Sequence, residues 1–212
     1  MTKVFPKATT SASATAISPY PDGKGNAAIL TVWKKSLLLN CNGFTVFDSK
    51  GDLVFRVDNY MASNKGEIVL MDSAGKPLHT IRRKRLSLGD NWMVYDGETA
   101  VNPRFSVRKH VNILNTKCLA YVSNYNNVKD GESGKNVLYA IEGSYTQRSC
   151  VVLDKKRRRV AEIKQKEAVG GVAFGVDVFR LIVNPEIDAA LAMTLVILLD
   201  QMFGSSRLRF ST

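Results

Sequence analysis

The chain has 212 residues, and 45% of them are hydrophobic, which is enough for the core of one large domain or two small ones and excludes a wholly disordered chain. Its 30 Lys and Arg residues outnumber 19 Asp and Glu residues, giving a net charge of +11, and this excess favours anionic partners such as phospholipid headgroups or nucleic acid. Cys41, Cys118 and Cys150 are an odd number of widely spaced cysteines, which disfavours a disulfide framework and fits a reducing compartment.

Residues 1–26 are predicted to form a flexible arm. Thr9 to Ile17 are small and polar, and the following SPYPDGKGN contains two prolines and two glycines that interrupt regular structure. No continuous apolar stretch of signal-peptide length occurs at the start, so secretion is not expected. Residues 27–212 are predicted to form a single domain.

From residue 28 the pattern changes to short apolar runs separated by Asp, Gly, Asn and Ser, which is typical of β-strands. An internal repeat of strand, Asp, turn and strand occurs at residues 44–57, 67–81, 91–107 and 149–163. The repeated aspartates are Asp48, Asp72, Asp96 and Asp154. An Asp at a strand end can bind backbone amides two residues on, and Gly51 or Gly75 supplies the positive φ that a tight turn requires. The repeat therefore predicts antiparallel hairpins. A metal site made of the four aspartates is disfavoured, because each belongs to a separate turn.

Further strands complete the predicted sheet. They are expected at Ile29–Lys34, Leu37–Asn40, Cys118–Ser123, Val137–Glu142, Val178–Val183 and Leu208–Phe210. Residues 124–136 are predicted to be a polar loop. Counting both arms of each hairpin, about a dozen strands are expected.

One segment near the C-terminus predicts a helix at about residues 186–203. Asn184 is placed to cap it, Pro185 fits the first helical position, and Gly204 fits the end. From Ala189 to Leu199 every residue except Thr194 is apolar, and a helix that is apolar on all sides must be buried on all sides or lie in a membrane. This run is shorter than the about 20 residues that a membrane span needs.

A fully buried helix in an otherwise β chain must be surrounded by sheet. A closed barrel of about 11 strands has room for a central helix, whereas eight-stranded barrels are filled by their own side chains. The sequence therefore predicts a mainly β fold, an antiparallel barrel of about 12 strands that encloses the hydrophobic C-terminal helix. A two-sheet sandwich with the helix between its layers is the alternative.

The stretch LTVWKKSLLLNCNGFTVFDSKGDLVFRVDNY at residues 30–60 resembles the opening of the plant LURP-one-related family, and the later hairpins and terminal helix follow in that family's order. The resemblance implies a fold like the tubby C-terminal domain and the phospholipid scramblases, a 12-stranded barrel around a hydrophobic helix. It also implies a plant source and a link to pathogen defence. The related tubby domain binds phosphatidylinositol bisphosphate through basic surface residues, which cannot be matched position by position to this chain.

The sequence contains little on which catalysis could depend. His79 and His110 lie on separate predicted strands, and no known catalytic motif surrounds them. The GESGKN segment at residues 131–136 departs from a phosphate loop, because Asn136 replaces the Ser or Thr that would bind magnesium. Cys150 lies within an apolar strand, where packing is its expected role. We therefore expect no enzyme, cofactor or metal site.

Two basic runs account for most of the charge excess. The first is Arg82, Arg83, Lys84 and Arg85 at the end of a hairpin arm, and the second is Lys155, Lys156, Arg157, Arg158 and Arg159 at a hairpin turn. Clusters of about four to eight basic residues are typical of sites for phosphoinositide or phosphatidylserine, each residue contributing about 1 kcal/mol. Such runs also protect strand edges from aggregation.

The runs and the resemblance together predict a non-enzymatic signalling or tethering module that binds anionic phospholipid, in particular phosphoinositide, and acts in plant defence. The alternatives are a protein-interaction scaffold and a nucleic-acid-binding regulator, both without lipid affinity. Trp33 and Trp92 lie within apolar runs, which disfavours base stacking and hence nucleic acid. We expect a cytoplasmic monomer without a transmembrane span, with the plasma-membrane surface and the nucleus as further locations.

Overall fold

The computed structural model describes residues 26–37, 41–60, 66–84, 89–99, 101–111, 117–125, 137–168 and 174–204. Four sequence-based predictions fall wholly or largely outside these ranges. They are the arm at 1–26, the strands at Leu37–Asn40 and Leu208–Phe210, and the polar loop at 124–136.

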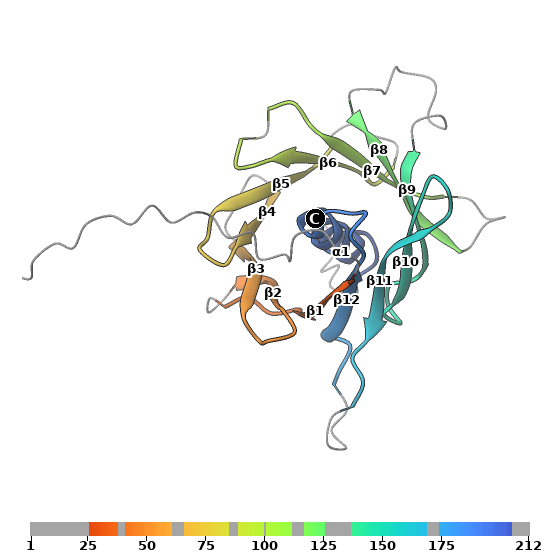
Figure 1. Cartoon of the computed structure of the whole chain (residues 1–212). Coiled ribbons are helices and arrows are strands. Elements are labelled where there is room, and N and C mark those ends of the chain that lie inside the picture. The colour runs from red at the N-terminus through yellow and green to blue at the C-terminus, as the bar shows by residue number, and fades with distance from the viewer. Residues whose placement is uncertain are drawn as a thin grey trace, which may run out of the picture.

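The described residues form twelve strands and one helix (Figure 1). The strands are β1 (Ala28–Trp33), β2 (Cys41–Phe47), β3 (Leu53–Tyr60), β4 (Glu67–Asp72), β5 (Pro77–Arg83), β6 (Asn91–Asp96), β7 (Phe105–Lys109), β8 (Cys118–Asn124), β9 (Val137–Ser144), β10 (Ser149–Asp154), β11 (Arg159–Gln165) and β12 (Val178–Val183). The helix is α1 (Ala189–Phe203).

The strands form one closed antiparallel barrel in which each strand pairs with its neighbours in sequence. β1 closes the ring because it pairs with both β2 and β12, with Thr31 opposite Phe47 on one side and Arg180 on the other. Side chains alternate across each strand, so that Leu30 and Val32 are buried while Trp33 is exposed. The predicted barrel is confirmed, and the two-sheet sandwich is excluded.

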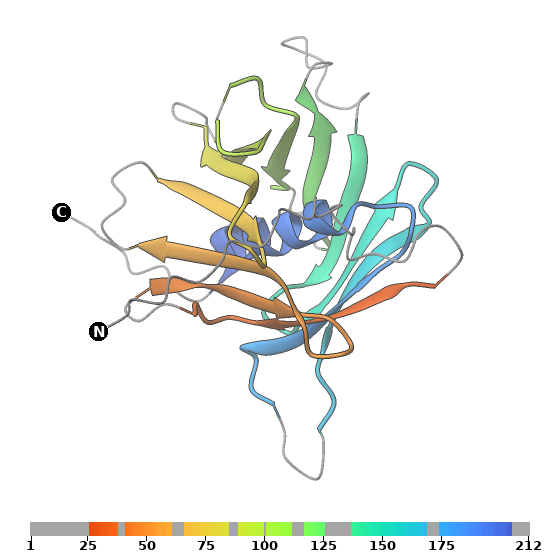
Figure 2. The same cartoon turned by 60° about the vertical axis from the view of Figure 1, so that its left-hand side comes forward.

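The helix α1 lies inside the barrel and is surrounded by its strands (Figures 1 and 2). Eleven of its 15 residues are buried, including every residue from Leu191 to Leu199. At 1.5 Å per residue, 15 residues span about 22 Å, which is close to the length of the strands around them. The apolar side chains of the helix and the inward faces of the strands thus form one hydrophobic core.

The helix begins later than predicted. Asp188, rather than Asn184, is the N-cap, and its carboxylate accepts a hydrogen bond from the Leu191 amide at 2.8 Å. The Asn184 side chain instead donates to the Arg159 carbonyl oxygen at 2.6 Å. Pro185 therefore belongs to the connection between β12 and α1. Gly204 ends the helix as predicted, and its N–H donates to the Asp200 carbonyl oxygen.

The repeated hairpins are present, and three of their four aspartates have the predicted role. The side chains of Asp48, Asp72 and Asp154 each accept hydrogen bonds from backbone amides of their own turns at 2.8 to 2.9 Å. Asp96 differs, because its carboxylate contacts the side chains of Arg104 and His79. The third copy of the repeat has thus acquired a different contact, described below.

Candidate functional site

The barrel has two chemically different ends, which we name after the helix. Because neighbouring strands are antiparallel all round the ring, every even-numbered strand ends at the same end of the barrel. Helix α1 starts there, after β12, and we call this the N-cap end. The helix finishes at the opposite end, the C-cap end, where Lys109 Nζ at the end of β7 lies 3.3 Å from the Met202 carbonyl oxygen.

The two predicted basic runs lie at opposite ends. The run from Lys155 to Arg159 follows β10 and occupies the β10–β11 turn, at the N-cap end. Arg82 and Arg83 end β5, and Lys84 follows them, at the C-cap end. Arg85 lies outside the described residues. The two runs therefore do not form one site.

Carboxylates balance most of the run at the N-cap end. Arg157 pairs with Glu142 at 2.7 Å, Arg158 with Asp154 at 2.7 Å, and Arg159 with Glu162 at 2.9 Å. Lys155 and Lys156 are exposed, and no described carboxylate pairs with either. Only these two lysines of the second run thus present uncompensated charge.

In the run at the C-cap end, carboxylates compensate the charges of the first two residues, Arg82 and Arg83. Arg82 pairs with Glu67, and its guanidinium carbon lies 6.0 Å from the centre of the Tyr95 ring. Arg83 pairs with Asp90. Lys84 is exposed, and its side chain pairs with none of the described carboxylates.

Two basic residues that the sequence patterns did not indicate lie at the same end as Lys84. Arg108 stands opposite Asn91 across the β6–β7 pair, and the carbonyl oxygen of Asn91 accepts the Lys84 amide at 2.8 Å. Lys117 directly precedes β8, the strand that pairs with β7 on its other side. Both Arg108 and Lys117 are exposed, and within the described ranges neither has a carboxylate partner. They are separated in sequence from Lys84, so only the strand pairing brings these cations together.

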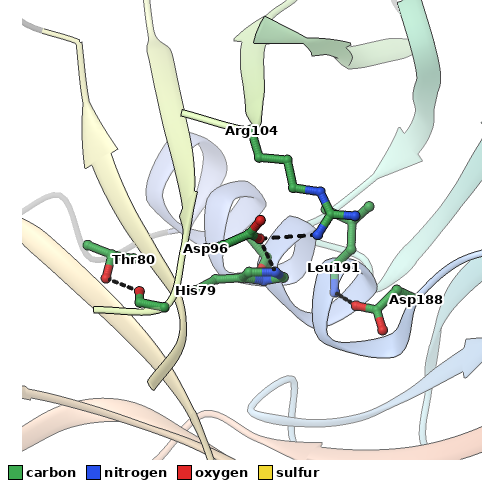
Figure 3. Close-up of polar contacts among 8 residues, drawn as sticks. His79, Thr80, Asp96, Arg104, Asp188 and Leu191 are labelled. Atoms are coloured by element: carbon green, nitrogen blue, oxygen red, sulfur yellow. Dashed lines mark hydrogen bonds and ion pairs between the residues drawn. The ribbon is translucent and has the colours of Figure 1, made fainter. Parts of the chain in front are cut away.

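A polar cluster lies between the barrel wall and the helix near the N-cap end, and Figure 3 shows Asp96 between His79 and Arg104. His79 on β5 points inward, and its Nδ1 lies 2.9 Å from Thr194 Oγ1 on α1. Its Nε2 lies 3.6 Å from Asp96 Oδ1 at the end of β6, and the same oxygen accepts a hydrogen bond from Arg104 at 3.1 Å. His79 is 5% exposed and Thr194 is 0% exposed, so the contact with the helix lies away from solvent.

Burial determines the protonation of His79. Desolvation lowers the pKa of His79 below its usual value, although the Asp188 and Asp96 carboxylates oppose this shift; the Arg104 guanidinium adds to it. The imidazole is therefore neutral near pH 7, and one ring nitrogen can accept while the other donates. The carboxylate of Asp96, the imidazole of His79 and the hydroxyl of Thr194 follow one another in the same order as the catalytic triad of serine hydrolases. Here, however, the hydroxyl faces the barrel core, and the arrangement positions the helix.

The sequence patterns did not indicate this contact for His79. The available signal was Thr194, the one polar residue in the apolar helical run. A buried hydroxyl needs a hydrogen-bond partner, and a polar residue at an inward-facing strand position can supply it.

Charged groups hold the helix at the C-cap end. Asp200 pairs with Lys34 Nζ at 2.9 Å and accepts a hydrogen bond from the Tyr145 hydroxyl at 3.2 Å. Arg148 is buried between two aromatic rings, with its guanidinium carbon 4.2 Å from the Tyr145 ring centre and 4.3 Å from that of Phe179. Cations near a helix C-terminus also interact favourably with the helix dipole.

Other reactive groups of the described residues are buried or dispersed. Cys118 and Cys150 are free and buried, and burial raises the pKa of Cys150 to about 12, which keeps its thiol protonated and weakly nucleophilic. In the described parts of the chain, no three His, Cys, Asp or Glu side chains are grouped to hold a metal ion.

The closed twelve-stranded antiparallel barrel around an apolar helix is the tubby-like fold that the sequence predicted. The family model described as LURP-one-related matches residues 28–200, so the chain belongs to the LURP-one-related family. Protein LURP-one-related 8 of Arabidopsis thaliana is 56% identical over 210 residues, which cover 97% of this chain and 100% of that protein. Protein LURP-one-related 17 of the same plant is 46% identical over 194 residues, covering 85% of each chain.

A solved structure supports the fold independently. The X-ray structure of another Arabidopsis thaliana protein matches with a TM-score of 0.60 and covers 83% of this chain and 91% of that chain, at 22% sequence identity. No described helix is both long and apolar enough to cross a membrane.

Proposed function

We propose that this LURP-one-related protein is a non-enzymatic tethering or signalling module that binds anionic phospholipid, including phosphoinositide, at the cytoplasmic surface of a membrane. Its barrel is a rigid support, and exposed basic side chains at one of its two ends contact the lipid headgroups.

The observation that carries this proposal is the uncompensated positive charge at the barrel ends. Lys155 and Lys156 at the N-cap end, and Lys84 with Arg108 and Lys117 at the C-cap end, are exposed and lack a carboxylate partner among the described residues. Cations near an anionic bilayer each contribute about 1 kcal/mol to binding. The arginines of both runs are engaged with carboxylates, so we give them a secondary role in this binding.

The buried chemistry of the described residues supports a non-enzymatic role. The Thr194 hydroxyl is 0% exposed, so a substrate could reach it only after the helix left the barrel. The Cys150 thiol is protected by burial in the same way.

A protein-interaction scaffold is the second candidate function. It is favoured by the ion pairs of Arg157, Arg158 and Arg159, because carboxylates already compensate these charges. Nucleic acid is the third candidate partner. It is a polyanion and would bind the same unpaired cations as the lipid headgroups.

Liposome co-sedimentation tests the proposal. The protein is mixed with vesicles of phosphatidylcholine alone, or with added phosphatidylserine or phosphatidylinositol bisphosphate, at low and moderate salt. We expect sedimentation with the anionic vesicles only, weakened by salt. Absence of sedimentation with every anionic vesicle would refute the proposal, and a salt-sensitive shift of DNA or RNA in its place would favour nucleic acid.

We extend the proposal to plant defence, which the family resemblance implies. Plants that lack the protein are expected to differ from wild type in pathogen growth after infection. Unchanged growth in such plants would remove the defence role and leave the lipid-binding proposal to its own test.

A further inference from the structure

Exposed apolar side chains lie at both ends of the barrel, and at one end three of them adjoin one another. Among the described residues the exposed large apolar side chains are Ile29, Trp33, Leu37, Val101, Val111, Tyr125 and Val176. Four of them, Trp33, Leu37, Val111 and Val176, follow or end odd-numbered strands and so lie at the C-cap end.

Trp33 is the last residue of β1, and Leu37 and Val176 belong to two connections that adjoin it. Trp33 ends β1 and is 42% exposed, Leu37 follows it and is 52% exposed, and Val176 precedes β12 and is 55% exposed. The connections are joined by a hydrogen bond of 2.7 Å from the Lys34 amide to the Asp177 carbonyl oxygen. They form an apolar rim on the β1–β12 side of the C-cap end.

Unpaired cations lie at the same end. Lys35, two residues after Trp33, is exposed, and no described carboxylate pairs with it. Lys84, Arg108 and Lys117 form the basic group on the β5–β8 side described above. At the N-cap end Lys50, Lys76, Lys155 and Lys156 are also exposed without a described carboxylate partner. What distinguishes the C-cap end is that its cations share that end with the apolar rim.

The apolar rim and the basic group lie on opposite sides of the ring. Five strands separate β1 from β7 in either direction round the barrel. A surface that touches both sides together must be broad and nearly flat, and it must accept both apolar and cationic side chains. An anionic bilayer has these properties, since Trp favours its interfacial region and Lys and Arg favour its headgroups.

We propose that the C-cap end is the membrane-facing end of the barrel, with Trp33, Leu37 and Val176 entering the interfacial region of an anionic bilayer. Lys35, Lys84, Arg108 and Lys117 then contact its headgroups. This orientation rests on the proposed lipid binding and specifies which end of the barrel faces the membrane. It places the β10–β11 turn, with Lys155 and Lys156, on the side away from the membrane.

The tryptophan content allows a direct test. Trp92 is 7% exposed, and a full-length Trp92→Phe protein leaves Trp33 as the single tryptophan reporter. With vesicles of phosphatidylcholine and phosphatidylserine we expect a blue shift of Trp33 emission and quenching by brominated acyl chains. Neither change is expected with phosphatidylcholine alone.

Matched variants identify the end that binds. Lys84→Gln, Arg108→Gln and Lys117→Gln together should weaken binding to anionic vesicles by about 100-fold at low salt, from about 1 kcal/mol per cation. Lys50→Gln, Lys155→Gln and Lys156→Gln together remove the same charge from the N-cap end and should change binding little. Leu37→Ser with Val176→Ser should reduce Trp33 quenching, whereas Val101→Ser, at the N-cap end and 69% exposed in the wild type, should not.

The outcomes separate this inference from the proposed function. If the wild type binds no anionic vesicle, lipid binding itself fails. If it binds but Trp33 is not quenched, or if the N-cap-end variant loses the binding, the orientation is overturned and lipid binding stands. A Trp33 shift that depends on protein concentration without vesicles would assign the apolar rim to self-association and also overturn the orientation. Unchanged thermal melting of each variant ensures that a loss reflects the surface.

Discussion

The two ends of the central helix are held by different chemistry. Near the N-cap end the contact is a buried hydrogen bond between His79 and Thr194. At the C-cap end the helix is held by Asp200, which contacts Lys34 and Tyr145 close to the surface. The surfaces differ as well: exposed cations without a described carboxylate partner lie at both ends, but only those at the C-cap end share it with the apolar rim of Trp33, Leu37 and Val176. One end therefore has a buried anchor, and the other combines a charged anchor with an apolar and basic surface that is available to a partner.

The strongest disruption removes the helix from both ends at once. Leu195 lies in the middle of α1 and is 1% exposed. Leu195→Asp would bury an unpaired charge, which costs several kcal/mol against a total stability of about 5 to 15 kcal/mol for a typical domain. We expect loss of the cooperative thermal transition in circular dichroism. The exposed Leu37→Asp is the control, and a melting curve unchanged in Leu195→Asp would show that the helix is not central to stability.

The buried anchor at the N-cap end is expected to have the next largest effect. Thr194→Val keeps the shape of the side chain but leaves His79 Nδ1 without its partner, which should cost about 1 to 3 kcal/mol of unfolding free energy. Urea denaturation measures this loss. Thr194→Ser restores the hydroxyl and should recover much of it, whereas equal losses in both variants would attribute the effect to packing.

The charged anchor at the C-cap end should be less sensitive. Tyr145→Phe removes one hydrogen bond to Asp200, whose ion pair with Lys34 remains. The expected loss is about 1 kcal/mol, measured in the same urea series. Tyr95→Phe, on the outer face of β6, is the control and should be neutral. A loss larger than that of Thr194→Val would reverse the comparison between the two ends.

Acid should weaken the N-cap end selectively. The folded-state pKa of His79 lies below its ordinary value of 6.5, chiefly because of burial. The unfolded chain therefore takes up the proton more readily, so the stability is fully present above about pH 6.5 and declines as the pH falls below it. The urea midpoint of the wild type should fall between pH 7.5 and 5. His79→Gln should lessen this dependence, and an identical pH profile in the variant would exclude His79 as its source.

Local patterns in the sequence predicted the fold well. Apolar runs bounded by Asp and Gly indicated the hairpins, and the apolar helix required a closed sheet to cover it. The start of the helix was placed too early, because Asn184 and Pro185 satisfy the sequence rules for a helix start. The folded chain uses Asn184 for a contact with β11 and begins the helix after Asp188.

The candidate surfaces were harder to predict, because they depend on contacts between distant residues. Arg108 and Lys117 are separated in sequence, and the pairing of β6, β7 and β8 places them near Lys84. The compensation of Arg157 likewise comes from Glu142 on another strand. Runs of like charge are visible in sequence, whereas the carboxylates that neutralise them are not.

The smallest expected effect concerns the β10–β11 turn at the N-cap end. Arg157 has a φ of 63°, in the left-handed region, where the matching turns carry Gly51 at 90° and Gly75 at 87°. Arg157→Gly relieves this strained conformation but loses the exposed pair with Glu142 and adds freedom to the unfolded chain. These terms oppose one another, so we expect the Tm to change by less than about 4 °C. Glu142→Gln loses the pair and keeps the strain, so Arg157→Gly should melt no lower than Glu142→Gln, and a lower Tm would contradict the strain argument. Because Arg157 lies away from the proposed membrane-facing end, vesicle binding should be unchanged in both variants.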